Sequence, residues 1–281
     1  MIIFPCCKIN LGLNVVGVRP DGYHDIETVF YPVPLFDALE ATEMDEKFPS
    51  AFDCDLKVTG NGVDCDEQKN LVVKAYGLLR QSHPIPRVHL HLHKRIPSQA
   101  GLGGGSSDAA CALRLLNEMF RVGLSADELQ GLAARLGADC PFFIRGEAAY
   151  ATGIGEILSP VPQKAGRDIL SGYWLALVKP AISVSTAEAY AGVKVEKPAK
   201  NCRGIVGQDI ATWREELVNS FEESVYARHP RLREIKQMLY DMGAAYAQMS
   251  GSGSAHFGIF RQKPENLADV FPEDFTFVCP L

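Results

Sequence analysis

The stretch Pro97-Ser98-Gln99-Ala100-Gly101-Leu102-Gly103-Gly104-Gly105-Ser106-Ser107-Asp108 holds four glycines within five positions. Because glycine carries no side chain, the backbone N–H groups of such a run can approach a polyphosphate without obstruction. Apolar residues at helical spacing follow it, so the run is expected to open a helix whose positive end faces the same anion. The stretch therefore predicts that residues 97–107 bind phosphate through the backbone.

Two common phosphate motifs do not fit this run. No Lys-Ser or Lys-Thr pair follows the glycines, which excludes a Walker loop, and Ser106 stands where a dinucleotide fingerprint has its third glycine. A plainer alternative is a turn that caps the helix with Ser106 or Ser107. A cap needs one glycine or serine, so the density of glycine favours the phosphate site.

The segment before the loop predicts a helix at about residues 70–81 and then a strand at 88–93. In that strand apolar residues alternate with His89, His91 and His93. The spacing of the histidines is able to bind a metal, but no Asp, Glu or Cys beside them completes a ligand set. A polar solvent face is the simpler explanation, so the histidines are left outside the site.

The segment after the loop predicts two helices. The first stops near Gly123, and the second begins with a capping box of Ser125 and Glu128 and is closed by Gly137. Asp139 lies just beyond, in a short acidic element between this cap and an expected apolar strand. A solitary carboxylate is costly to bury there without a cation nearby.

The amino-terminal segment predicts a half-buried strand, because the apolar residues from Ile9 to Val15 fall on odd positions. Lys8 and Asn10 share the opposite face, and Lys8 is the one charged residue between positions 2 and 18. A turn is expected at residues 19–22, followed by a returning strand through 25–31. Tyr23 and His24 stand at that corner.

Glycines and prolines between residues 153 and 172 suggest a domain boundary, so we expect domains at 1–155 and 156–281. In the second domain the pattern predicts a strand at 173–178, helices near 213–226 and 230–242, and a strand, glycine turn and strand over 244–260. The late glycines of residues 249–254 can close over a phosphate or simply form a hairpin, and the sequence supports both.

The composition limits the class of protein. The chain has 281 residues, 47% hydrophobic content and a net charge of −6, which disfavours nucleic acid or an anionic membrane as partner. Its first residues resemble no leader peptide, and no apolar run is long enough for a membrane span, so a cytoplasmic enzyme is expected. The eight cysteines form no C-x-x-C pair and are expected to be reduced core thiols.

Lys8 and Asp139 are the charged candidates for chemistry. Phosphoryl transfer needs a group that orients or deprotonates the attacking hydroxyl and a cation that offsets developing charge. Spacing alone leaves simpler roles equally open, a strand-end lysine for Lys8 and a helix cap or turn for Asp139. Tyr23, His24 and Tyr190 could stack on a flat heteroaromatic ligand, although packing is the commoner role of such rings.

Taken in order, these segments resemble the superfamily of galactokinase, homoserine kinase, mevalonate kinase and phosphomevalonate kinase, the GHMP kinases. Residues 97–110 resemble its phosphate loop, and residues 249–253 resemble its late glycine motif. Within the superfamily, four further motifs resemble the kinases that act on a cytidine diphosphate-linked methylerythritol in the non-mevalonate route to isoprenoids. These motifs are Lys8-Ile9-Asn10-Leu11, Asp21-Gly22-Tyr23-His24, Leu136-Gly137-Ala138-Asp139-Cys140-Pro141-Phe142 and Gly153-Ile154-Gly155-Glu156.

The resemblance implies an α+β fold of two domains, an amino-terminal nucleotide-binding α/β domain and a carboxyl-terminal ferredoxin-like domain. It also implies ATP and Mg²⁺ as cofactors, with residues 97–107 holding the ATP phosphates. By the same resemblance Lys8 and Asp139 form the catalytic pair, and Asn10, Tyr23, His24 and Tyr190 surround the cytidine end of a small-molecule substrate. Alternatives are another GHMP kinase, of the homoserine or mevalonate type, and a nucleotide-binding module without catalysis.

Two positions and one segment depart from the expected pattern. Ser220 stands where the family commonly has aspartate, and His256 follows the late glycines where a small or apolar residue is usual. Residues 194–209 match nothing in the family pattern. These departures bear on the second domain and leave the expectation of a kinase unchanged.

Overall fold

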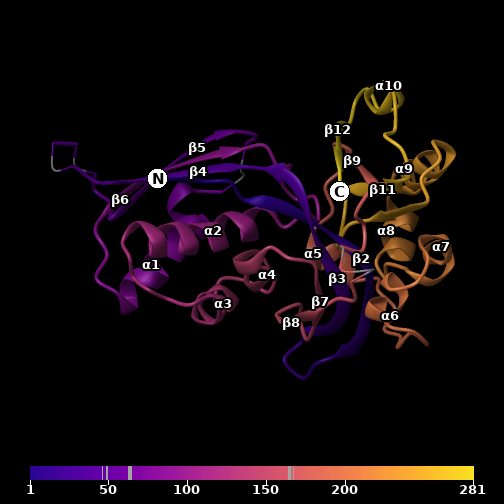
Figure 1. The fold of residues 1–281 in the computed structure, drawn as a ribbon, viewed down its shortest axis with the longest axis horizontal. Helices are drawn as coiled ribbons and strands as arrows, with labels where there is room; N and C mark the ends of the chain where they lie inside the picture. The colour runs from indigo at the N-terminus through magenta and orange to yellow at the C-terminus, as the bar shows by residue number, and fades with distance from the viewer. Residues whose placement is uncertain (46, 49, 63–64, 164–165, 167) are drawn as a thin grey trace. The chain divides into compact units, whose positions relative to one another are not determined.

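A computed structural model describes residues 1–45, 47–48, 50–62, 65–163, 166 and 168–281. The chain forms two compact units (Figure 1). Unit 1 contains residues 1–7, 34–98 and 103–147, and unit 2 contains residues 8–33, 99–102 and 148–281. These units are discontinuous in sequence, whereas the expected boundary after residue 155 divides the chain once, and that boundary stays a prediction.

Unit 1 is a four-stranded sheet with helices packed on it, in the strand order β1-β4-β6-β5. Strands β4 and β6 are antiparallel, and β5 and β6 are parallel. Helices α1 and α2 pack against each other and against this sheet, as Figure 1 shows. The strands are β1 (Ile2–Ile3), β4 (Ala38–Glu43), β5 (Cys54–Gly60) and β6 (Val88–Lys94), and the helices are η1 (Glu67–Lys69), α1 (Leu71–Ser82), α2 (Gly104–Met119), α3 (Ala126–Ala134) and α4 (Cys140–Arg145).

Local sequence accounts for these elements. The alternation in β6 is confirmed, because Val88, Leu90 and Leu92 are buried while the histidines between them are partly or fully exposed. Asn70 caps α1 by accepting a hydrogen bond from the backbone N–H of Val72. The expected capping box of α3 is present in full.

Unit 2 contains two further sheets. The first has the order β2-β3-β7-β8, and the second has the order β10-β11-β9-β12 with antiparallel neighbours throughout. Their strands are β2 (Cys6–Val18), β3 (His24–Phe36), β7 (Ala149–Thr152), β8 (Ile157–Pro160), β9 (Trp174–Lys179), β10 (Tyr246–Met249), β11 (His256–Phe260) and β12 (Phe275–Pro280). The ends of β2 and β3, residues 6–7 and 34–36, are counted with unit 1.

Short helices complete unit 2. They are α5 (Thr186–Tyr190), α6 (Cys202–Val206), η2 (Ile210–Thr212), α7 (Trp213–Glu216), α8 (Glu222–Arg228), α9 (Pro230–Asp241) and α10 (Leu267–Val270). Helix α9 packs on β10 and β11, with Leu232, Ile235 and Leu239 fully buried. The buried core of this unit also includes Val178 and Phe221. The expected α+β fold of two parts is thereby confirmed.

Three local predictions were wrong. Strand β2 is not half-buried, because its polar residues are as buried as its apolar ones, with Lys8 at 3% exposure and Asn10 at 1%. Residues 140–145 form helix α4 instead of a strand, with Pro141 in its first turn. The helix expected over 213–226 is interrupted after Glu216, because the backbone of residues 217–220 turns to hydrogen-bond Leu13 of β2.

The cysteine prediction is confirmed, since all eight cysteines are free and six of them are buried. Burial raises the pKa of the Cys111 thiol to about 12 and that of Cys140 to about 11, so these thiols are poor nucleophiles at neutral pH. None of the helices in the described ranges is both long and apolar enough to cross a membrane.

Candidate functional site

The first half of the glycine loop, residues 99–102, belongs to unit 2 and is fastened by the backbone. The carbonyl of Leu102 accepts a hydrogen bond from the backbone N–H of Lys8 at 3.0 Å, and the carbonyl of Ala100 accepts one from Ala255 at 3.1 Å. The carbonyl of Gly101 accepts a third bond, from the hydroxyl of Ser250 at 2.9 Å. Strand β2 and the glycine-rich residues 249–254, which we call the late glycine segment, therefore fix the shape of the first half of the glycine loop.

Gly101 could not be another residue here. Its φ is +74°, and a Cβ at this position would lie 1.9 Å from the backbone oxygen of Ser250. Gly251 is packed less tightly, since a Cβ there would lie 3.3 Å from Asn10 Oδ1 and 3.3 Å from the carbonyl oxygen of Gly101. Residues 250–255 join β10 to β11 as a hairpin and also pack on residues 100–101 of the glycine loop, and their closure over a phosphate stays a prediction.

Lys8 is buried and precisely held. Its Nζ donates to Asn10 Oδ1 at 2.6 Å and to the carbonyl of Gly101 at 3.1 Å, and it lies 5.0 Å from the centre of the Phe30 ring. Asn10 in turn donates to the hydroxyl of Thr28 at 3.0 Å. A snorkelling strand-end lysine does not have this environment, because snorkelling places the ammonium group in water. These bonds fix the position of the ammonium group inside unit 2.

The second half of the glycine loop, residues 103–107, belongs to unit 1 and forms the start of α2. Gly103 occupies the cap position with φ +68°, and no side chain caps the helix. Ser106 and Ser107 lie inside the first turn, so the alternative in which either serine caps the helix was wrong. The first backbone N–H groups of a helix have no partner within the helix, and here no side chain substitutes for one. This helix start can therefore bind an anion.

Gly104 and Gly105 differ in what surrounds them. A Cβ at Gly104 would lie 3.0 Å from the side chain of Ile96, so packing explains this glycine. A Cβ at Gly105 would meet nothing within 4 Å, and Gly105 is exposed. Glycine in a helix costs about 0.5–1 kcal/mol relative to alanine. No neighbouring atom of the folded chain requires glycine at position 105. A ligand that approaches the backbone of Gly105 would require it.

Asp139 lies in unit 1, at the cap position of α4, but its carboxylate makes no capping hydrogen bond to the helix. The simpler role of a helix cap is therefore not supported. Lys8 lies in unit 2, and the pairing of Lys8 with Asp139 stays a prediction.

The predicted aromatic residues lie together in part. The rings of His24 and Tyr190 stack with centres 4.6 Å apart, and Tyr190 meets Phe221 edge to face at 4.8 Å. Tyr23 is 60% exposed beside the turn, and its backbone N–H donates to Asp21. The structure thus brings His24 and Tyr190 into one stack, with Tyr23 at the adjoining corner.

The sequence analysis missed a buried ionic cluster in unit 1. Lys94 Nζ donates to Asp37 and, at 2.6 Å, to Asp108 Oδ2, and all three residues are at least 96% buried. A signal was present: Lys94 continues the buried phase of β6 after Val88, Leu90 and Leu92. A lysine on the apolar face of a strand indicates a buried partner of opposite charge.

The two departures noted in unit 2 have local roles. The Ser220 hydroxyl accepts the backbone N–H of Val15 at 3.1 Å. His256 is fully buried, its Nδ1 donates to the carbonyl of Ser254 at 3.1 Å, and its Nε2 lies 2.9 Å from the Tyr226 hydroxyl. Both side chains support the backbone around the late glycines and β2. Residues 194–209 contribute α6, whose Cys202 packs beside Gly12 of β2.

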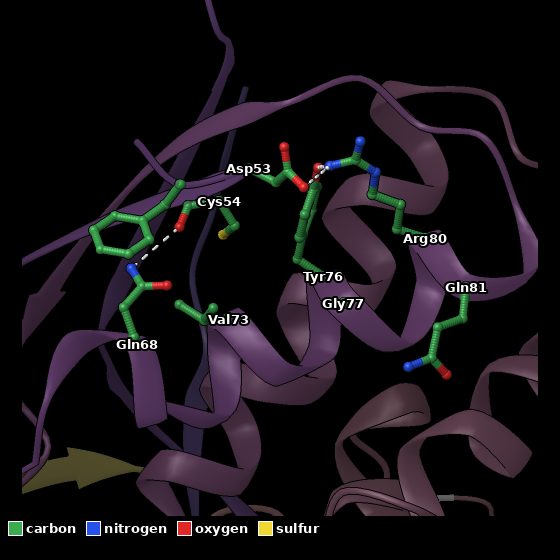
Figure 2. A pocket seen from close by; sticks show the side chains of 9 residues that line it. Asp53, Cys54, Gln68, Val73, Tyr76, Gly77, Arg80 and Gln81 are labelled. Carbon is green, nitrogen blue, oxygen red and sulfur yellow. Dashed lines mark hydrogen bonds and ion pairs between the residues drawn. The ribbon is translucent and has the colours of Figure 1, made fainter. Parts of the chain in front are cut away.

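Two of the pockets in unit 1 are lined in part by residues of β5 and η1. One, of about 280 Å³, is lined by residues 58–62 with Cys65 and Glu67. Its wall is tied to the segment that enters the glycine loop, because Asn61 donates to the carbonyl of Arg95 at 2.8 Å. The other, of about 400 Å³, lies along α1 (Figure 2), where Arg80 bridges Tyr76 and Asp53. None of the predicted site residues lines the pocket of Figure 2.

Family models match two parts of the chain. The model described as GHMP kinases N terminal domain matches residues 70–147, and the model described as GHMP kinases C terminal matches residues 200–276. The first match contains α1, the second half of the glycine loop and Asp139. The second match contains the late glycine segment.

Curated relatives resemble the chain over nearly its whole length. A 4-diphosphocytidyl-2-C-methyl-D-erythritol kinase of Parabacteroides distasonis is 48% identical over 269 residues, which are 96% of this chain and 94% of the relative. The protein of the same name from Bacteroides fragilis strain ATCC 25285 is 47% identical over 281 residues and covers all of both chains.

Solved structures have the same fold. A 4-(cytidine 5'-diphospho)-2C-methyl-D-erythritol kinase matches with a TM-score of 0.80 and 29% identity, covering 99% of this chain and 98% of the other. A mevalonate kinase of Methanococcus jannaschii matches with a TM-score of 0.71 but 13% identity, covering 100% of this chain and 98% of the other. The second likeness concerns the fold alone.

Proposed function

The chain belongs to the GHMP kinase family, and on that premise we propose that it transfers the γ-phosphoryl group of ATP to the 2-hydroxyl of 4-diphosphocytidyl-2-C-methyl-D-erythritol, a step of the non-mevalonate route to isoprenoids. One observation carries the choice of substrate: relatives named for this substrate are 44–49% identical over most of the chain. The reaction of ATP with a soluble nucleotide conjugate fits a cytoplasmic enzyme.

The ATP phosphates bind at residues 97–107 in this proposal. Support comes from the uncapped start of α2 and from Gly105, whose lack of a side chain nothing in the folded chain requires. Backbone N–H groups at a helix start and the helix dipole both favour a phosphate there. The carbonyl of Gly101 is already bonded to Lys8 and Ser250, so it is turned into the protein and leaves the anion site to N–H groups.

The nucleoside end of ATP binds in the pocket of residues 58–62, Cys65 and Glu67. Support comes from its position in unit 1, because hydrogen bonds join Asn61 to Arg95 and Ser98 to Gly62. These bonds connect the pocket wall to residues that lead directly into the phosphate loop. One nucleotide can therefore bind the pocket with its base and α2 with its phosphates.

Asp139 orients the 2-hydroxyl or accepts its proton, and Lys8 offsets the negative charge that develops during transfer. Two observations support these assignments: the carboxylate of Asp139 does not cap α4, and the ammonium group of Lys8 is buried and held by Asn10 and Gly101. Asn10 is best supported as the residue that orients Lys8, since its Oδ1 accepts from Lys8 Nζ.

The nucleotide enters as its Mg²⁺ complex. Among the described residues no group of three or more His, Cys, Asp or Glu side chains is arranged to hold a metal. Mg²⁺ commonly keeps its waters and binds substrate phosphates, so it would be held mainly by the nucleotide and would supply positive charge against the phosphates. Positioning of the hydroxyl and the phosphates remains the work of the chain itself.

The cytidine end of the acceptor binds beside the stack of His24 and Tyr190, with Tyr23 adjoining it. The exposed ring of Tyr23 gives a cytosine a surface on which to stack. Homoserine and mevalonate carry no such ring, so these residues distinguish the proposed acceptor from those of other GHMP kinases.

A substrate panel tests this proposal. Purified protein is given ATP, Mg²⁺ and one of three acceptors: 4-diphosphocytidyl-2-C-methyl-D-erythritol, mevalonate or homoserine. We expect ADP release with the first alone. ADP release with mevalonate or homoserine instead would show that the proposed acceptor is wrong. ATP binding without ADP release on any acceptor would indicate a nucleotide-binding module without catalysis.

A further inference from the structure

Beneath the start of α2, unit 1 buries three charged side chains that the proposed mechanism does not use. Lys94 comes from the end of β6, Asp37 from the junction of β3 and β4, and Asp108 from the second turn of α2. Lys94 Nζ donates to one carboxylate oxygen of each aspartate, and the exposed fractions of the three residues are 4%, 1% and 2%. We call these three residues the Lys94 cluster.

The Lys94 cluster holds both ends of the segment that carries residues 97 and 98. Asp37 Oδ1 accepts the backbone N–H groups of Arg95 and Ile96 at 2.5 and 2.8 Å, which fixes the entry of the loop. Lys94 holds Asp108, which fixes the first turns of α2. A Cβ at Gly104 would lie 3.4 Å from Lys94 Nζ, so the ammonium group is directly behind the helix start.

The charges of the cluster do not balance when both aspartates are ionised. Two carboxylates against one ammonium group leave a net charge of −1, which is costly in a buried site. Of the two carboxylates, Asp108 has fewer hydrogen bonds to stabilise its negative charge, because its Oδ1 is buried without a hydrogen-bond partner. A proton on Asp108 would remove the net charge. Burial also raises the pKa of Asp108, while Lys94 lowers it and Asp37 raises it.

We propose that the Lys94 cluster positions the phosphate loop and takes up a proton at Asp108 when ATP binds, an inference that rests on the proposed role of this loop. The phosphates of ATP bring several negative charges to the face of α2 that lies over the cluster. Negative charge nearby favours the protonated form of a carboxyl group. Nucleotide binding and protonation of Asp108 therefore reinforce each other. The three side chains are positioning residues, since none of them touches the nucleotide.

Other titratable groups near the cluster do not replace Asp108 in this role. Cys111 on α2 and Cys140 on α4 are buried thiols whose pKa values burial raises to about 12 and about 11, so they stay protonated in the neutral range. Cys6 on β2 also has a pKa raised by burial. The positive charge of Arg114, further along α2, lowers the pKa of the Cys6 and Cys111 thiols, but burial outweighs it.

If proton binding at Asp108 and ATP binding are thermodynamically linked, the linkage sets the direction in which ATP affinity changes with pH. If binding takes up a proton, ATP affinity falls as pH rises through the titration of Asp108. One fully linked proton changes the dissociation constant about tenfold per pH unit, and half a proton changes it about threefold. The phosphates of ATP titrate in a similar range, so the quantity that isolates the protein is the difference between the unaltered chain and a variant that lacks the carboxylate.

Isothermal titration of ATP into the full chain, from pH 6 to 9, tests the inference. For the unaltered protein, titrations in two buffers of different ionisation enthalpy give the number of protons taken up. We expect net uptake and a dissociation constant that rises about threefold or more per pH unit relative to Asp108→Asn. The amide of Asp108→Asn mimics the neutral carboxyl group, so at pH 8.5 this variant should bind ATP more tightly than the unaltered protein, and the two dissociation constants should converge as the pH falls to 6.

Asp127→Asn is the matched control, because Asp127 lies on α3 of the same unit and is exposed. Its pH dependence should equal that of the unaltered protein. Equal pH slopes for Asp108→Asn and Asp127→Asn, with no proton uptake by the unaltered chain, would overturn the inference and leave the proposed function intact. Failure of the unaltered chain to bind ATP at any pH would overturn the proposed function and this inference together.

Discussion

Replacing Gly105 by alanine separates the stability of α2 from its capacity to bind phosphate. The added Cβ meets nothing within 4 Å in the folded chain, and the backbone of Gly105 is helical without a positive φ. Alanine should therefore stabilise the helix by about 0.5–1 kcal/mol, which corresponds to a rise of about 1–4 °C in Tm. If the phosphates approach this backbone, the methyl group occupies part of their space. An overpacked contact costs about 1–3 kcal/mol, so the dissociation constant of ATP should rise about 5- to 150-fold.

Gly131→Ala supplies the control. Gly131 is also exposed inside a helix, α3, and a Cβ there also meets nothing within 4 Å. This variant should gain the same stability and keep the ATP affinity of the unaltered protein. Thermal unfolding and isothermal titration with ATP give the two quantities for each variant. If Gly105→Ala is stabilised and still binds ATP within twofold of Gly131→Ala, the phosphates do not lie on the first turn of α2.

Three further predictions concern unit 2. Gly101→Ala should lower the free energy of unfolding by about 2–4 kcal/mol, because its Cβ would collide with the backbone of Ser250 and its φ is +74°. Chemical denaturation measures this loss, and an unchanged denaturation midpoint would contradict the described packing. Asn10→Ala should lower kcat about 10-fold or more at nearly unchanged ATP affinity, because Lys8 loses the acceptor that orients it. Steady-state kinetics with varied ATP measures both constants, and a rise in the KM for ATP with an unchanged kcat would refute this role of Asn10. Burial lowers the pKa of His256 to about 3 from 6.5, so below pH 6.5 the unfolded chain binds the extra proton. Above pH 6.5 His256 is neutral in both states and does not change the free energy of unfolding. Between pH 6.5 and 3 the free energy of unfolding falls by up to about 1.4 kcal/mol per pH unit as the pH is lowered. Denaturation curves at pH 7 and 5 should differ less for His256→Gln than for the unaltered chain, and identical differences would exclude His256 as the cause.

Periodicity predicted most of the fold because it reports which side of an element faces the core. The alternation of Val88, Leu90 and Leu92 located β6 to within a residue, and the capping pair of Ser125 and Glu128 located the start of α3. Where periodicity was misleading, tertiary contacts had overridden local preference. The polar face of β2 is buried because Lys8 and its neighbours meet hydrogen-bond partners from residues distant in sequence, such as Gly101.

The helix expected over residues 213–226 shows the same limit. Its pattern is helical, but Asn219 donates to the carbonyls of Met249 and Gly251, and Leu13 bonds the backbone on both sides of Asn219. These partners are too far along the chain for a local pattern to reveal them.

The candidate site was predictable to a similar degree. The glycine loop was recognisable because a high density of glycine lets the backbone approach a ligand, and its binding of phosphate stays a prediction. The Lys94 cluster was not recognised, although Lys94 falls on the buried phase of its strand. Its partners Asp37 and Asp108 lie 57 and 14 residues away, and only the packed sheet brings them to Lys94.

The turnover of Asp139→Asn tests the catalytic account most directly. The amide keeps the shape of the side chain but can neither accept a proton nor carry charge, so the hydroxyl of the acceptor loses its base or orienting group. With ATP, Mg²⁺ and 4-diphosphocytidyl-2-C-methyl-D-erythritol, we expect kcat to fall by about 10²–10⁴-fold, while calorimetry finds the ATP dissociation constant within about twofold of the unaltered protein. A variant that keeps near-normal kcat would show that Asp139 is not the group that prepares the hydroxyl for phosphoryl transfer.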